Sequence, residues 1–124
     1  MIYEDVAPER DEVDVLFFVV GDILYGTDAS QVLRIERSLP NDLRVPELGA
    51  LRHGNRALVF DAPEGEGHLM VDAIRGVRPV PIRDLRRLPL VAGAAPFTVG
   101  VFLDQERPVM LIDLLETLNA QGRH

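Results

Sequence analysis

The chain has 124 residues, enough for one domain, and 47% of them are hydrophobic. It contains no cysteine, which excludes disulfides and thiol chemistry and makes a reducing cytoplasm the expected compartment. The net charge of −7 disfavours nucleic-acid binding, and no apolar run approaches the about 20 residues that a membrane span needs. The composition therefore predicts a globular protein that neither binds nucleic acid nor inserts into a membrane.

The start of the chain differs in composition from the rest. Residues 1–12 are acidic and have few apolar side chains, which predicts a disordered tail. The remaining residues, 13–124, contain no obvious internal repeat and no low-complexity segment. We therefore expect them to form one folded domain.

Short apolar runs between turn residues predict a series of β-strands. The expected strands are residues 13–20, 23–28, 43–51, 56–60, 69–74, 76–82, 97–103 and 109–112. The segment 43–51 contains Pro46, so we expect a short edge strand that runs into one helical turn. Two prolines place residues 76–82 at an edge or a bend. This pattern predicts a mainly β protein built as one or two small barrels or a sandwich.

Short helical segments are expected at three places. Asp28 or Ser30 is a suitable cap for one turn in which Val32 and Ile35 face inward. A second turn or partial helix is expected over residues 84–90. A C-terminal helix is expected from Asp113, because Asp113 and Glu116 approximate a capping box.

The hairpin formed by residues 97–112 is the element around which the chain is organised. Its two strands are apolar on either side of the polar turn 104–108, so we expect them to be buried on much of both faces. The C-terminal helix follows this hairpin directly. None of these residues is a plausible catalyst, and we interpret the element as architecture.

Side chains capable of catalysis are scattered. A metal site is conceivable from Asp61, Glu64, Glu66 and His68, but their loop has the composition of an ordinary hairpin turn, so we expect no metal and no cofactor. Asp72 lies inside an apolar run, where a hydrogen bond to the backbone is the expected role. The sequence therefore favours a binding module over an enzyme.

Five arginines form the most basic part of the chain. They are Arg75, Arg78, Arg83, Arg86 and Arg87. One interpretation is a solvated edge strand with its loop. The other is a docking surface for an acidic partner, because arginine is favoured at protein interfaces.

Three segments resemble the CheW-like family and follow one another in the order found there. Residues 17–36 resemble its opening hairpin, F-x-hydrophobic-G-x-x-x-Y-G, with the V-x-x-I segment after it. Residues 56–77 resemble its V-D-x-V-x-x-V hairpin, and residues 96–115 resemble its last hairpin, G-V-x-x-L-D-G-x-x-V-x-L-L-D-L. The matching residues are Phe18, Gly21, Tyr25, Gly26, Asp28, Val32 and Ile35, then Val71, Asp72, Ile74 and Val77, then Gly100, Val101, Leu103, Asp104, Val109, Leu111, Asp113 and Leu114.

The chain departs from the family pattern at three places. Of the family hairpin G-V-x-N-L-R-G-x-x-x-P-V-x-D-L, only the second half is recognisable, at residues 43–51 with Glu47 in place of Asp. The chain is therefore shorter by one turn and one strand of about 6 residues. Gln105 and Glu106 replace the turn glycine of the last hairpin, and Arg34 occupies an acidic position.

The resemblance implies two small, packed β-barrel subdomains with short helices that share one core, one arm being shorter than usual. It also implies a non-catalytic adaptor that couples chemoreceptor cytoplasmic tips to the regulatory domain of a CheA-type histidine kinase, in the cytoplasm at receptor arrays. The expected docking surface is around Val32, Arg34 and Ile35, and core packing is the alternative role of Val32 and Ile35. Arg83, Arg86 and Arg87 form the second candidate surface.

Two alternative functions and one structural question stay open from the sequence. The first alternative is that a shortened member of this family acts as a regulator, which binds the kinase or another array component without coupling receptors. An unrelated small β ligand-binding domain or enzyme is the second alternative. A missing strand either exposes a barrel edge, which favours a homo-oligomer or a partner strand, or is replaced by the loop over residues 38–55.

Overall fold

The computed structural model describes residues 11–87 and 97–121, without the side chains of Glu47, Arg87, Ala120 and Gln121. These residues form strands, one α-helix and three 3-10 turns, the turns being labelled η. In chain order the elements are β1 (Glu12–Val20), β2 (Ile23–Asp28), η2 (Ala29–Gln31), β3 (Val32–Arg37), η3 (Pro46–Leu48), β4 (Arg56–Ala62), β5 (Gly65–Val71), β6 (Ala73–Pro81), η4 (Ile82–Asp84), β7 (Leu85–Arg87), β8 (Thr98–Asp104), β9 (Arg107–Ile112) and α1 (Leu114–Gln121). The prediction of a mainly β protein is confirmed.

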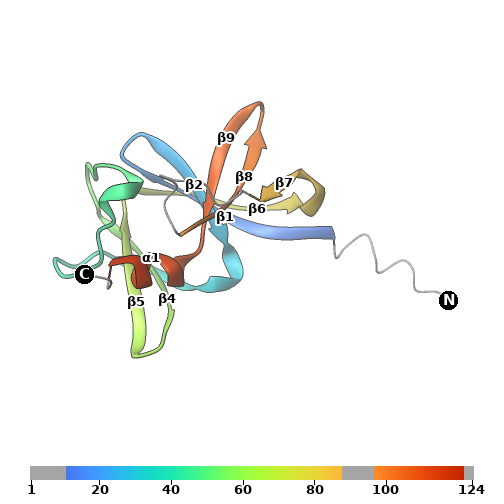
Figure 1. Ribbon diagram of the computed structural model, residues 1–124. Helices are drawn as coiled ribbons and strands as arrows, with labels where there is room; N and C mark the ends of the chain where they lie inside the picture. The colour runs from blue at the N-terminus through green and yellow to red at the C-terminus, as the bar shows by residue number, and fades with distance from the viewer. Residues whose placement is uncertain (1–10, 88–96, 122–124) are drawn as a thin grey trace.

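The larger sheet contains six strands in the order β6-β1-β2-β9-β8-β7. Neighbouring strands are antiparallel except β2 and β9, which run parallel. Its two edge strands, β6 and β7, follow one another in the chain and are joined only by η4. The sheet therefore curls towards itself as a half-barrel, in which β7 returns beside the end of β6 (Figure 1).

Strand β1 lies between two hydrophobic clusters, because successive side chains of a strand point to opposite faces. Leu16, Phe18 and Val20 belong to the larger cluster. Val15 and Phe17 belong to the second cluster, which fills the half-barrel together with side chains from β6, β8 and β9. All five side chains are buried. The apolar run of β1 is continuous because this strand is shared by two cores, so the single shared core that the resemblance implies is wrong.

The smaller sheet is antiparallel and has the order β3-β4-β5. Leu58, Phe60 and Leu69 from this sheet enter the larger cluster together with Leu114 of α1. In Figure 1, α1 lies across β4 and β5, between this sheet and the half-barrel. The C-terminal helix therefore joins the two sheets within the larger cluster.

Residues 38–55 connect β3 to β4 and replace the missing arm. No strand forms here, so the expected edge strand over 43–51 is wrong beyond a single bridge between Leu43 and Leu69. The Leu43 N–H donates to the His68 carbonyl, and the Met70 N–H donates to the Leu43 carbonyl, each at 2.9 Å. The predicted helical turn is present as η3, whose Leu48 is buried. This segment therefore covers part of the outer edge of β5.

Two further local predictions are wrong. The helical turn capped by Asp28 ends at Gln31, and Val32 and Ile35 lie on β3 because that segment pairs with β4. The last hairpin is buried on one face only, since Val99 and Leu103 are 50% and 59% exposed.

Two other predictions fall partly on residues without a description. Within residues 84–90, the described part is the end of η4 and the strand β7, which pairs with β8, and not a helix. Of the predicted tail 1–12, residues 1–10 lie outside the described residues, and β1 begins at Glu12.

Asp113 caps α1 as predicted. Its Oδ1 accepts a hydrogen bond from the Glu116 N–H at 3.1 Å. The Asp113 N–H donates to the Phe97 carbonyl at 2.9 Å, so Asp113 supplies half of a capping box and also ties the helix start to the residue just before β8.

Candidate partner-binding surfaces

The first predicted surface lies on β3, an edge strand of the smaller sheet. Val32 pairs with Phe60 and packs against the larger hydrophobic cluster. Ile35 pairs with Leu58 on the same face but remains 42% exposed. The two residues therefore have different roles. Val32 packs against the core, whereas Ile35 exposes apolar surface that a partner could cover.

Arg34 points to the other face of β3 and is held by residues of its own chain. Its guanidinium donates to Glu66 at 2.5 and 2.8 Å, and its Nε donates to Glu36. The hydrogen bonds with Glu66 and then Glu36 raise the pKa of Arg34, and the hydrogen bond from Arg34 lowers the pKa of Glu66. Within the described residues, three of the five guanidinium donors therefore have a partner.

The second predicted surface lies at the far edge of the half-barrel. Arg83 is on η4 and Arg86 on β7, and both are exposed. The Arg86 side chain donates to the carbonyls of Arg83 and Leu85. Arg87 ends β7, and its side chain is outside the described part. Because β3 and β7 belong to different sheets, the fold does not bring the two predicted surfaces together.

Asp72 is the buried carboxylate that the sequence singled out. Its Oδ1 accepts the N–H groups of Arg52, His53 and Gly54 at 2.7, 2.6 and 2.9 Å, and its Oδ2 accepts the Gly21 N–H at 2.6 Å. Burial alone raises the pKa of Asp72, but these four hydrogen bonds outweigh it and leave the pKa below its ordinary value. Asp72 therefore fastens the β1–β2 turn and residues 52–54 to the smaller sheet, and the predicted backbone role is confirmed.

Arg78 has a role that the sequence did not reveal. Its guanidinium lies 4.4 Å from the centre of the Phe17 ring and 3.2 Å from the Asp104 carboxylate. Arg78 is on β6 and Asp104 ends β8, so this pair spans the open side of the half-barrel. The two residues are 26 positions apart, and no local pattern links them.

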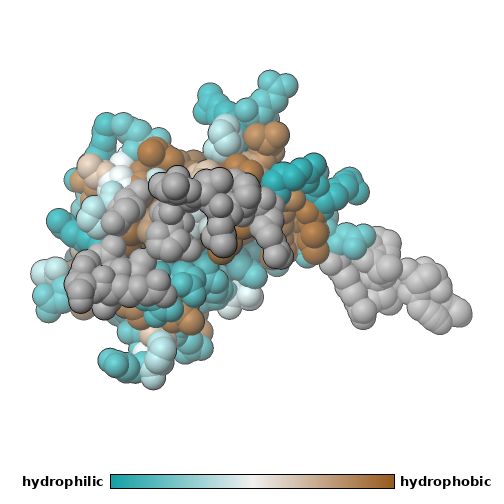
Figure 2. Space-filling model, viewed as in Figure 1, coloured by the Kyte–Doolittle hydropathy of each residue, from teal (hydrophilic) through white to brown (hydrophobic). Residues whose placement is uncertain are grey.

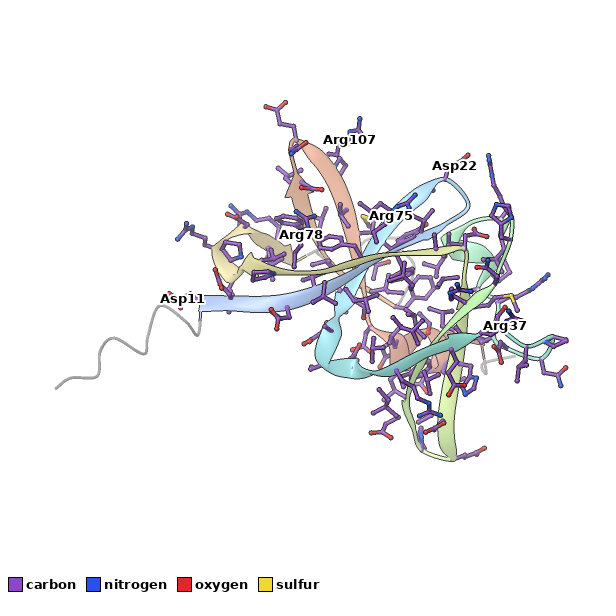
Figure 3. The ribbon with its side chains drawn as sticks, turned by 180° about the vertical axis from the view of Figure 1, so that it is seen from behind. Asp11, Asp22, Arg37, Arg75, Arg78 and Arg107 are labelled. Carbon is purple, nitrogen blue, oxygen red and sulfur yellow. The ribbon has the colours of Figure 1, made fainter. Side chains whose placement is uncertain are left out.

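A cleft of about 550 Å³ opens at this side of the molecule. Its lining includes charged residues of both signs and the apolar residues Phe17, Val19 and Leu24. The charged residues are Asp22, Arg52, Asp72, Arg75, Arg78 and Asp104, and His53 also lines the cleft. Figure 3 shows Arg75 and Arg78 along β6 and Asp22 at the neighbouring β1–β2 turn. Arg52 pairs with Asp22 at 2.6 Å and Arg78 with Asp104, so most of this charge is neutralised within the chain.

The residues considered for a metal site lie at the tip and outer face of the β4–β5 hairpin. Across residues 11–87 and 97–121, no group of three or more histidine, cysteine, aspartate or glutamate side chains is arranged to hold a metal ion. His68 lies 3.3 Å from Asp42, and this contact holds the loop after β3 against β5.

Exposed apolar side chains are the remaining feature of the surface. Figure 2 shows hydrophilic residues at the tips of the β4–β5 and β8–β9 hairpins, with hydrophobic residues exposed between the two hairpins. On β3 the exposed apolar residues are Leu33 and Ile35, and Leu39 follows in the next loop.

Within the described ranges, no helix is long and apolar enough to cross a membrane.

The comparisons with known proteins identify the family. No family model matches the chain. It is 62% identical over 112 residues to the Frizzy aggregation protein FrzB of Myxococcus xanthus, which covers 90% of this chain and all of FrzB. The structure superposes on the scaffolding protein TtCheW of Thermoanaerobacter tengcongensis with a TM-score of 0.69, at 17% identity and over 90% of this chain and 96% of TtCheW. The chain therefore belongs to the same CheW-like family as FrzB, and its fold is that of the scaffolding protein TtCheW.

Proposed function

We propose that this protein is a cytoplasmic adaptor of a bacterial chemosensory array, which couples the cytoplasmic tips of receptors to the regulatory domain of a CheA-type histidine kinase. The observation that carries the proposal is the match to a scaffolding protein along almost the whole chain, together with 62% identity to FrzB. An adaptor needs an exposed apolar contact on a rigid element and no reactive group. Ile35 on β3 meets that requirement.

The docking surface is proposed to be β3, centred on Ile35, with Arg34 contributing charge at its side. Val32 supports this surface from the core. Arg83, Arg86 and Arg87 form a separate proposed contact for an acidic partner, at an edge of the other sheet. Because the two surfaces lie on different sheets, they are suited to two partners bound at once.

Capture of a purified CheA-type regulatory domain tests the first surface. Ile35→Asp places a charge on exposed apolar area and is expected to abolish capture while leaving the fold intact. The matched control is Leu103→Asp, because Leu103 is an exposed apolar residue on β8 in the other sheet. Circular dichroism melting reports whether both variants are folded. Full retention of binding by a folded Ile35→Asp variant removes β3 from the proposal.

A regulator that binds without coupling is the second candidate. The observation that favours it is the segment 38–55, which forms one bridge and one 3-10 turn where the CheW-like family pattern has a hairpin arm. Reconstitution of kinase with receptors separates the two functions. Receptor-dependent kinase activation supports the adaptor, and binding without activation supports the regulator.

A further inference from the structure

The smaller sheet has two edge strands, β5 and β3, and only the outer edge of β5 is covered by another described segment of the chain. The outer edge of β5 is covered at Leu43 by the segment that follows β3. The outer edge of β3 has no neighbouring strand among the described residues. In Figure 3, β3 crosses the near side of the molecule and ends by the labelled Arg37. Uncovered strand edges are templates for pairing with another chain.

The backbone groups that β3 presents to the outside follow from its pairing with β4. The Ser38 N–H donates to the Asn55 carbonyl, in the same register that pairs Glu36 with Ala57 and Arg34 with Val59. Backbone groups of successive residues point alternately to the two sides of a strand. The N–H and C=O groups of Ile35 and Arg37 therefore point away from β4, towards the open edge.

The side chains of β3 decide which strand fits beside it. Leu33 and Ile35 are 47% and 42% exposed, while Arg34 and Glu36 lie on the opposite face. A bulge at Leu33 interrupts the pairing with β4, so the regular part of the strand is Arg34–Arg37. A strand that pairs with this edge must cover the apolar side chains on one face. On the other face it must place an acidic group near Arg34 and a basic group near Glu36.

We propose that this occupant is a second copy of the chain, whose β3 pairs antiparallel with the first about a twofold axis at Ile35. The alternation of backbone groups allows three registers near this centre. In the first register, Ile35 lies opposite Leu33 of the second copy, and the two Arg34 side chains face each other. In the second register, Ile35 lies opposite Arg37 of the second copy, and the two Glu36 side chains face each other. Ile35 opposite Ile35 sets Arg34 against Glu36 twice, which is the one register of the three with complementary charges.

The proposed dimer satisfies the open edge and covers its apolar residues. Ile35 packs on Ile35 at the axis, and Leu33 lies against the aliphatic stem of Arg37 of the second copy. The two guanidinium donors of Arg34 that have no partner among the described residues face Glu36 of the second copy. The two three-stranded sheets become one continuous sheet of six strands. A second copy would also cover Ile35, so dimerisation and the proposed partner docking would exclude one another.

Charge exchange tests this inference on the purified chain alone, so its outcome is independent of the proposed adaptor function. Sedimentation equilibrium is expected to show a mass that rises from one chain to two as concentration increases. Arg34→Glu and Glu36→Arg, made separately, each place like charges across the interface and are expected to weaken self-association about tenfold. Mixing the two variants restores both opposite-charge pairs and is expected to recover the dimer as a one-to-one heterodimer.

Cross-linking provides a second measurement that does not depend on these charges. The chain has no cysteine, so Ile35→Cys introduces one thiol, and a short bis-maleimide is expected to join two copies of this variant. Leu103→Cys is the control, with an equally exposed thiol on the other sheet. A wild-type chain that stays a monomer at every concentration, a mixture that fails to recover the dimer, or equal cross-linking at both positions would overturn the inference.

Discussion

Removing the charge of Asp72 is expected to destabilise the fold more than any exposed substitution. In Asp72→Asn, the amide oxygen can retain the three N–H groups of Arg52, His53 and Gly54 that Oδ1 accepts. The amide nitrogen then faces the Gly21 N–H, which leaves two donors against each other. Hydrogen bonds to charged groups contribute roughly 1.5–3 kcal/mol each, so losing one and weakening three predicts a loss of about 3 kcal/mol.

The pH dependence of this loss gives a sharper test. The folded-state pKa of Asp72 lies below its ordinary value, so the ionised carboxylate stabilises the fold above the unfolded-state pKa of about 3.9. That stabilisation is lost as the pH falls through the folded-state pKa. The difference between wild type and Asp72→Asn is therefore expected to be full at neutral pH and to shrink below about pH 4.

Urea unfolding followed by circular dichroism measures both quantities. With a slope of about 1.5 kcal/mol per M, typical for a small domain, a loss of 3 kcal/mol moves the midpoint by about 2 M. Asp22→Asn is the matched control, because Asp22 makes one exposed ion pair with Arg52. A midpoint within about 0.3 M of wild type at neutral pH, or a difference that does not shrink in acid, would refute the hydrogen-bond account.

Two further substitutions probe single contacts. Glu106→Gly is expected to stabilise the chain by about 1 kcal/mol, because Glu106 has a φ of +70° in the β8–β9 turn and glycine adopts that conformation without strain; an unchanged or lower melting temperature would contradict this. Arg78→Ala removes the contacts with Phe17 and Asp104 and is expected to cost about 1 kcal/mol. Arg75→Ala, on the same strand, should be neutral in the same denaturation assay, and equal losses would show that Arg78 does not brace the half-barrel.

Local chemistry explains the parts of the fold that could be predicted from the sequence. Asp113 caps α1 through an N–H three residues away, and Asp28 caps η2 through one two residues away. Such contacts depend on neighbours along the chain, so composition and spacing are sufficient. The hairpins could be predicted from the sequence for the same reason, since turn residues and apolar runs are local features. The resemblance to CheW-like domains rested on these hairpins.

The site was predicted less completely, because the same residues were compatible with two local structures. The spacing of Val32 and Ile35 suits one face of a helical turn, yet the segment is a strand. Pairing with β4, more than 20 positions further along the chain, decides between the two. The same pairing buries Val32 and leaves Ile35 at an open edge.

The sequence by itself determined the class of the protein: an acidic, cysteine-free β domain with capped turns and one carboxylate, Asp72, inside an apolar run. Only the tertiary structure decided that β1 separates two cores and that Arg78 meets Asp104 across the half-barrel. It also decided that Leu43 covers β5, while the outer edge of β3 has no neighbouring strand in the described part of the chain. These features join residues distant in the chain. They depend on which strands become neighbours, and side-chain patterns within a strand specify its faces but not its neighbours.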